Sequence, residues 1–162
     1  MISKLDVKQS LISGRGVFSL RPIKKDETIY FLSGREISLR ELVGMINNLK
    51  KDAADPLQID VETYIDLNEF SRLFNHSCNP NAFIRGKNEL VALMDIDKEE
   101  EITYDYSTTM WENKEKIESE FNRKLWTMQC HCNSTNCRKL IDQFYFLPLS
   151  VSFIFVSYEF FY

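Results

Sequence analysis

Three cysteines stand close together toward the C-terminal end of the chain. They are Cys130, Cys132 and Cys137, in the pattern C-x-C-x4-C. Three closely spaced thiolates can wrap one tetrahedral zinc ion, but a closed structural site requires a fourth ligand. The remaining cysteine is Cys78, inside the segment FNHSCNPN, and its participation would attach the C-terminal loop to the middle of the chain. His131 is a competing ligand, although its place between two ligating cysteines makes it hard for its ring to reach the same ion.

Three further segments carry residue types that suit a functional site. They read SGRGVF at 13–18, RLFNHSCNPN at 72–81 and EEEITYDY at 99–106. Each is weak by itself, because a glycine pair usually marks a turn and an Asn-rich segment can simply cap backbone groups. All three in this order, with the C-x-C-x4-C loop behind them, form a far more specific combination.

This combination resembles the SET-domain lysine methyltransferases that carry a post-SET zinc loop. The resemblance extends over roughly residues 10–139, most of the chain. It implies a mainly β fold with short helices, in which small curved sheets surround a threaded, knot-like junction. The NHSC and TYDY segments would pass one another at that junction, and a zinc-stapled loop would follow at the C-terminal end.

The resemblance also implies roles for individual residues. The S-adenosylmethionine pocket would be bordered, largely through backbone contacts, by Ser13, Gly14, Arg15, Gly16, Arg72, Asn75 and His76. The Asn75 amide would meet the amino-acid end of the cofactor. Tyr106 matches the tyrosine whose hydroxyl lies at the reaction centre. The ligands of one structural zinc would be Cys78, Cys130, Cys132 and Cys137.

Methyl transfer from a sulfonium to an amine requires a neutral lysine, a held cofactor and the exclusion of water. Tyr104 and Tyr106 alternate with Asp105 on an expected strand, so their side chains share a face and form two walls of one channel. The alternative for Tyr104 is an ordinary core tyrosine. The family carries Phe or Tyr at that position, and a tyrosine there implies mono- or dimethylation.

The chain departs from the family pattern at one stretch near the cofactor. The usual Glu-Tyr-x-Gly-Glu corresponds to Phe-Leu-Ser-Gly-Arg at 31–35, so Leu32 stands where a tyrosine is expected. Tyr30 or Tyr64 would line the pocket instead. The charged segment 107–129 is also longer than usual, and together these departures leave the choice of substrate open.

Hydrophobic spacing predicts the elements that must position these residues. Short apolar runs predict strands at 17–20, 28–32, 61–67, 90–93 and 101–106, while 52–58 and 75–81 are expected to be irregular. Apolar residues at helical spacing predict a helix over 39–49, which a capping box of Ser38 and Glu41 would start. Similar spacing predicts a second, amphipathic helix over 111–128, followed by a compact cysteine loop.

The expected organisation is a SET domain at 1–110 with a helical insert at about 38–50, a linker helix and zinc loop at 111–139, and an apolar aromatic tail at 140–162. The tail has one charge after residue 143, Glu159, but also several serines. Alternation of apolar residues with serine favours a strand or packed extension over a membrane anchor.

Composition restricts the class of protein further. The chain has 162 residues, 44% of them hydrophobic and 27% charged, which is typical of one globular domain. A net charge of −4 argues against general nucleic-acid binding. Residues 1–11 lack an apolar leader, so a reducing intracellular compartment is expected, in which clustered cysteines bind metal.

The sequence therefore predicts an S-adenosylmethionine-dependent protein-lysine methyltransferase that acts on an exposed lysine, such as one in a histone tail. It would work in the nucleus of a eukaryote and otherwise in the cytoplasm, without direct binding to nucleic acid or membrane. Two alternatives are a catalytically silent SET-like binding module and a zinc-stapled protein that senses redox state. The retained Tyr106 and the intact NHSC segment favour the enzyme.

Overall fold

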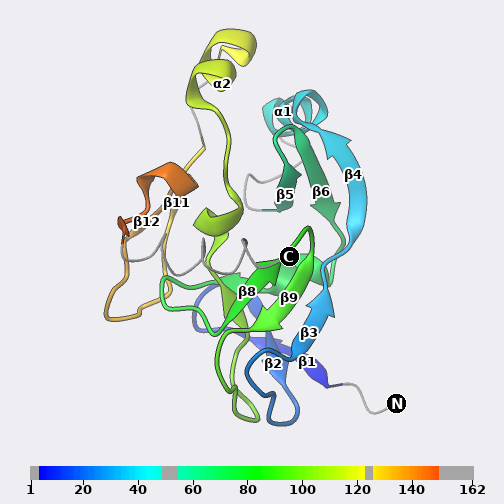
Figure 1. The fold of residues 1–162 in the computed structure, drawn as a ribbon, viewed down its shortest axis with the longest axis vertical. Coiled ribbons are helices and arrows are strands. Elements are labelled where there is room, and N and C mark those ends of the chain that lie inside the picture. The colour runs from blue at the N-terminus through cyan, green and yellow to red at the C-terminus, as the bar shows by residue number, and fades with distance from the viewer. Residues whose placement is uncertain (1–3, 49–54, 123–125, 150–162) are drawn as a thin grey trace.

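The computed structural model describes residues 4–48, 55–122 and 126–149. Within these ranges the chain forms short strands arranged in small sheets, with both α-helices at the same end of the molecule (Figure 1). The expected mainly β fold with short helices is confirmed.

Three antiparallel sheets build most of the body. A ribbon pairs β1 (Leu5–Gln9) with β2 (Arg15–Ser19). One three-stranded sheet has the order β3 (Thr28–Phe31), β9 (Glu89–Ala92), β8 (Ala82–Arg85). The other has the order β4 (Gly34–Ser38), β6 (Thr63–Leu67), β5 (Pro56–Asp60), so β5 lies at an edge.

A two-stranded parallel pair forms where distant parts of the chain cross. β7 (Asn75–His76) pairs with β10 (Thr103–Tyr104), with Asn75 opposite Thr103 and His76 opposite Tyr104. The amide of Ser77 extends the pairing by donating to the carbonyl of Tyr104 at 3.1 Å. The NHSC and TYDY segments therefore run side by side, as the expected threaded junction requires.

Helix α1 (Leu39–Asn47) begins where the capping box predicts. The Ser38 hydroxyl accepts a hydrogen bond from the Glu41 amide, and the buried face carries Leu39, Leu42 and Val43. Its last predicted residue, 49, lies outside the described residues.

The prediction for the second helix was too long. Helix α2 covers only Lys114–Phe121, where 111–128 was expected. Asn113 caps its first turn by accepting from the Lys116 amide, and Asn122 adopts a left-handed conformation (φ 49°) that ends it. Apolar spacing had extended the prediction to Met128, which instead lies in β11 (Met128–Gln129), paired with β12 (Leu140–Ile141).

Several strands were not predicted, among them β1, β5 and β8, and β7 lies within 75–81, which was expected to be irregular. Apolar alternation in β1 is limited to Leu5 and Val7, and β5 occupies residues 56–60, most of which were expected to form a loop. β1 and β5 each pair antiparallel with a neighbour in sequence, β1 with β2 and β5 with β6. Hydrogen bonds to the partner strand stabilise them as strands, and local composition does not reveal those bonds.

Two large groups of buried side chains form most of the core. The larger lies among β2, β3, β6, β9 and the crossing, and includes Val17, Leu32, Phe74, Ile102 and Tyr104. The second joins α1, α2 and the C-terminal loop, and includes Leu42, Tyr64, Ile117, Trp126, Cys78 and Cys130. The cysteine loop is therefore packed into the fold. Among the described residues, no helix is both long and apolar enough to span a membrane.

Candidate active site and cysteine cluster

The two tyrosines of the TYDY segment lie against each other at the crossing. Tyr104 ends β10, and Tyr106 begins the 3₁₀ turn Tyr106–Thr109, so only the first remains in the strand. Their ring centroids are nevertheless 4.8 Å apart, with the rings tilted by 47°. The hydroxyl of Tyr106 donates to the carbonyl of Phe74 at 2.8 Å. Burial raises the pKa of both phenols, so both hydroxyls are neutral near pH 7.

Asn75 connects this crossing to the glycine loop at 13–16. Its side-chain nitrogen lies 3.3 Å from the Ser13 carbonyl, 3.1 Å from the Arg15 carbonyl and 2.7 Å from Glu101 Oε1. The three segments singled out in the sequence therefore meet here. Glu101 was missed, because the acidic run before TYDY gives no indication that one of its carboxylates turns inward.

Glycine stands at the two positions of this loop for different physical reasons. Gly14 has φ 48°, a left-handed conformation, and a β-carbon there would meet no atom within 4 Å. A β-carbon on Gly16 would collide with the carboxylate of Glu101. Space is therefore open beside the first glycine, whereas the second is required by close packing.

His76 faces the amide of Tyr106. Its Nδ1 accepts a hydrogen bond from that amide at 3.1 Å. Burial lowers the pKa of His76 to about 4, so the ring is neutral near pH 7. This residue fixes the position of the Tyr106 backbone within the candidate site.

The predicted cofactor residue Arg72 has local partners. Its guanidinium donates to the carbonyls of Leu67, at 3.2 Å, and Asn68, at 3.4 Å, and lies 3.8 Å from Asp55. These contacts fasten the end of β6 to the 3₁₀ turn Ser71–Leu73. Its contact with a cofactor stays a prediction.

The two candidate replacements for the family tyrosine lie in different places. The Tyr30 ring packs 5.7 Å from the ring of Phe74, whose carbonyl receives the hydroxyl of Tyr106. The Tyr64 hydroxyl instead donates to Glu112 at 3.1 Å, within the second core group. Tyr30 is therefore the better placed of the two, and its role stays a prediction.

The four cysteines form one cluster. Their sulfur atoms all lie within 4.8 Å of one another, with Cys130 3.6 Å from both Cys78 and Cys137. Zinc–sulfur bonds of about 2.3 Å in a tetrahedron place the sulfurs ~3.8 Å apart, so the donor set fits a zinc ion. His131 is exposed and is not among the clustered donors. Burial raises the pKa of the Cys78 thiol, and a bound metal would overcome this because coordinating thiols are deprotonated.

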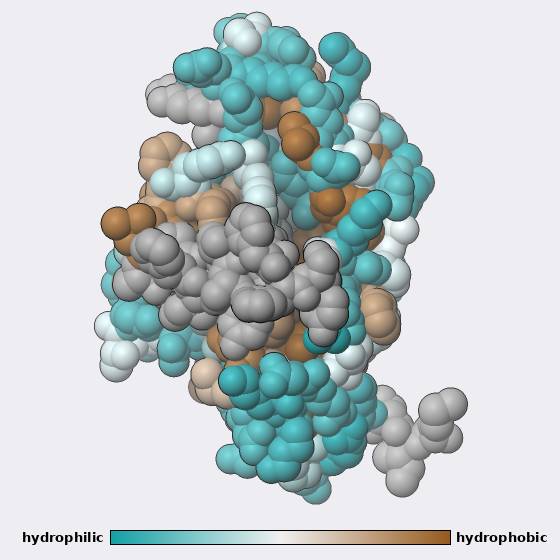
Figure 2. Space-filling model, in the orientation of Figure 1, coloured by the Kyte–Doolittle hydropathy of each residue, from teal (hydrophilic) through white to brown (hydrophobic). Residues whose placement is uncertain are grey.

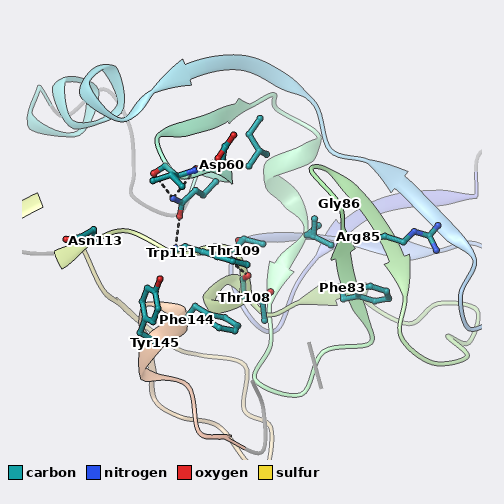
Figure 3. Close-up of a pocket in the computed structure, with 14 residues that line it drawn as sticks. Asp60, Phe83, Arg85, Gly86, Thr108, Thr109, Trp111, Asn113, Phe144 and Tyr145 are labelled. Atoms are coloured by element: carbon teal, nitrogen blue, oxygen red, sulfur yellow. Dashed lines mark hydrogen bonds between the residues drawn. The ribbon is translucent and has the colours of Figure 1, made fainter. Parts of the chain in front are cut away.

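A cavity of about 420 Å³ lies beside the turn that starts at Tyr106 (Figure 3). Thr108 and Thr109 line it, together with the end of β5, the β8–β9 hairpin and the 3₁₀ turn Phe144–Phe146. The Trp111 ring stacks on Phe144 with centroids 5.2 Å apart, and its indole N–H donates to the Thr108 carbonyl at 2.7 Å. The sequence did not reveal this cavity, because its walls come from four separate segments.

Comparison with known families matches the SET domain to residues 14–107. The chain belongs to the SET-domain family. The match contains the glycine loop from Gly14, the NHSC segment and the tyrosine pair. The resemblance seen in the sequence is thereby confirmed.

Three curated relatives of this SET domain are similar at modest identity. They are a variant-silencing SET domain-containing protein of Plasmodium falciparum (30% over 153 residues), histone-lysine N-methyltransferase SETD1B of Homo sapiens (28% over 154 residues) and the H3 lysine-36 specific histone-lysine N-methyltransferase of Candida albicans (27% over 152 residues). The alignments cover 84%, 86% and 86% of this chain but only 6%, 7% and 17% of the relatives, respectively.

One solved structure has the same fold. The methyltransferase domain of human histone-lysine N-methyltransferase SETMAR superposes with a TM-score of 0.65 at 24% identity. The match covers 86% of this chain and 58% of that one. This similarity supports the SET fold of the chain.

Proposed function

We propose that this SET domain is a protein-lysine N-methyltransferase that transfers a methyl group from S-adenosylmethionine to a lysine side chain. The observation that carries the proposal is the Tyr104–Tyr106 pair, held at the crossing beside the loop that Asn75 secures. The names of two relatives, both histone-lysine N-methyltransferases, support it. The proposed substrate is an exposed lysine of a protein such as a histone, which would place the activity in the nucleus of a eukaryotic cell.

The loop at 13–16 is the proposed cofactor site. Its residues present backbone groups, and the open space beside Gly14 leaves room for a ligand close to the main chain. Asn75 holds the loop by its side-chain nitrogen, which is bonded to the Arg15 carbonyl. S-adenosylmethionine, when bound there, would supply a methyl group on a positively charged sulfur.

The tyrosines would prepare the lysine. Free lysine has a pKa of about 10.4, so almost all of it is protonated at neutral pH. An apolar, aromatic environment disfavours the ammonium form and lowers that pKa. The neutral hydroxyl of Tyr106, already fixed by the Phe74 carbonyl, would orient the amine for in-line attack.

The cavity beside the 3₁₀ turn is the proposed contact for the polypeptide around the target lysine. It begins at Thr108, two residues after Tyr106, and its other side includes the edge strand β5. In the upper part of the face seen in Figure 2, brown hydrophobic patches lie among teal polar side chains. A recess with a fixed aromatic stack is therefore a more selective contact than the open surface.

The alternative function is a catalytically silent binding module, which would bind a protein at the same cavity without methylating it. An assay with labelled S-adenosylmethionine, a panel of histones and cell lysate separates the two. We expect labelled protein from the wild type and a loss of turnover on the order of 100-fold in Tyr106→Phe, with cofactor affinity nearly unchanged. Tyr64→Phe is the matched control, since it also removes a buried hydroxyl. Cofactor binding without any transfer across the panel would favour the silent module.

A further inference from the structure

Two hydrogen-bonded routes connect the sulfur of Cys78 to the backbone around Tyr106. The first passes through His76. Because Nδ1 accepts a hydrogen bond from the Tyr106 amide at 3.1 Å, the ring proton is on Nε2. That nitrogen lies 3.4 Å from Cys78 Sγ, within hydrogen-bond range of a sulfur acceptor.

The second route passes through Arg138, which directly follows the last clustered cysteine. Its amide donates to Cys78 Sγ at 3.4 Å. Its guanidinium donates to Asp105 Oδ1 at 2.7 Å and lies 3.3 Å from the Ser107 hydroxyl. Asp105 Oδ1 also accepts from the Ser107 amide at 3.1 Å, so this route ends on both sides of Tyr106.

The ion pair in the second route is buried. The Asp105 side chain is 0% exposed and that of Arg138 is 16% exposed. Asp105 Oδ2 has no hydrogen-bond partner in the described structure, so Arg138 is the main compensation for this carboxylate. Removing one partner of a buried pair leaves an uncompensated charge, which is strongly destabilising locally. Here the destabilised residue lies between the two tyrosines.

We propose that Arg138 is a positioning residue for the tyrosine pair and that it transmits the state of the cysteine cluster to Tyr106. The proposal rests on the proposed function and adds a means of regulation to the same site. Both routes end on Cys78 Sγ, and a bound metal would fix the position of that sulfur, so both routes are firmest when the cluster is loaded. Four thiolates and one Zn²⁺ carry a net charge of −2, from 4 × (−1) + 2, which also favours the cationic Arg138.

Arg138→Met and Arg138→Lys test this proposal in the full chain. The control is Arg35→Met, which removes an exposed ion pair with Glu41 on the surface. Three quantities are measured: zinc per chain, kcat and cofactor KM, and hydrogen exchange over residues 103–109 with and without a chelator. Zinc content and hydrogen exchange require no substrate.

For Arg138→Met we expect about one zinc per chain, kcat reduced at least about 10-fold, and cofactor KM within about twofold of wild type. Hydrogen exchange over 103–109 should accelerate at least about 10-fold in this variant with the metal still bound. In the wild type, the chelator alone should cause a similar acceleration. Arg138→Lys should restore part of both effects because it keeps the charge. Arg35→Met should resemble the wild type throughout.

Zinc loss in proportion to the loss of kcat would overturn the proposal, because Arg138 would then only hold the loop. Unchanged exchange over 103–109 in Arg138→Met would overturn it as well. If Arg138→Met does not fold, the double variant Asp105→Asn/Arg138→Met removes both charges. This double variant should bind zinc, and its hydrogen exchange over residues 103–109 should be faster than that of the wild type. A wild-type exchange rate in this variant would refute the proposal. Absence of methyl transfer by the wild type would reject the proposed function while leaving the exchange test intact.

Discussion

Gly16 lies so close to Glu101 that a β-carbon on the glycine would stand 2.7 Å from the carboxylate carbon. The same β-carbon would be 3.0 Å from the side-chain nitrogen of Asn75. This packing explains why the second position of the loop requires glycine. The Glu101 carboxylate that packs against Gly16 also accepts a hydrogen bond from the Asn75 side-chain amide. The glycine loop, Asn75 and Glu101 therefore act as one assembly.

The first prediction concerns Gly16→Ala. The added methyl must displace the Glu101 carboxylate and with it the 2.7 Å hydrogen bond from Asn75. We expect a loss of about 1–2 kcal/mol in the free energy of unfolding and cofactor affinity weakened about 10-fold. Denaturant titration and calorimetry measure the two quantities.

Gly44→Ala is the matched control for this glycine change. Gly44 lies within α1, and a β-carbon there would meet nothing within 4 Å. Alanine should stabilise the helix by about 0.5–1 kcal/mol without affecting cofactor affinity. Equal cofactor affinity in Gly16→Ala and wild type would show that the loop tolerates displacement of Glu101.

The second prediction is a pH dependence of stability that originates at Glu112. Burial raises the pKa of Glu112 from 4.5 to about 7, although the hydrogen bond from Tyr64 opposes the rise. The folded state therefore binds the proton more tightly than the unfolded state does. Stability contributed by this group decreases as pH rises from about 4.5 to 7, and the penalty is fully present above 7.

Glu112→Gln should remove that penalty. We expect it to exceed the wild type in free energy of unfolding by about 1–3 kcal/mol at pH 8, with the difference shrinking as pH falls toward 5.5. Urea titrations of both proteins at the same zinc concentration measure this difference. The contribution of the metal to stability is common to both proteins and cancels. Glu118→Gln, an exposed change on α2, should show no such trend. A difference independent of pH would contradict a raised pKa of Glu112 in the folded state.

The third prediction concerns the metal. Cys78→Ser removes one of four clustered thiolates and the one that belongs to the middle of the chain. Zinc bound per chain should fall well below one, and hydrogen exchange over 130–141 should accelerate, because metal binding and local folding are coupled. His131→Ser, an exposed neighbour, should keep one zinc. Absence of zinc from wild-type protein purified without chelator would refute the site itself.

The parts of this fold that were predicted correctly are those with chemically unusual residues. The cysteine cluster followed from residue types and spacing, the crossing followed from the resemblance to SET-domain proteins, and α1 followed from helical apolar spacing and its cap at Ser38. The missed features depend on contacts between distant segments. Neither the inward carboxylate of Glu101 nor the Arg138–Asp105 pair has a local signal, because many acidic and basic residues look alike until the chain folds.

The fourth prediction concerns how many methyl groups are transferred. Tyr104 is 5% exposed and its ring lies 4.8 Å from the ring of Tyr106, so the two rings are the proposed walls of one channel. We expect the wild type to stop at one or two methyl groups, because a hydroxyl there holds the amine, or a water beside it, and crowds the position of a further methyl.

Tyr104→Phe removes one oxygen while keeping the ring, which lets the methylated amine rotate after each transfer. Mass spectrometry of the product should then show a shift toward trimethyl-lysine, with Tyr64→Phe as a control that removes a hydroxyl in the second core group. Abundant trimethyl-lysine from the wild type, or an unchanged distribution in Tyr104→Phe, would show that other walls of the channel set the limit.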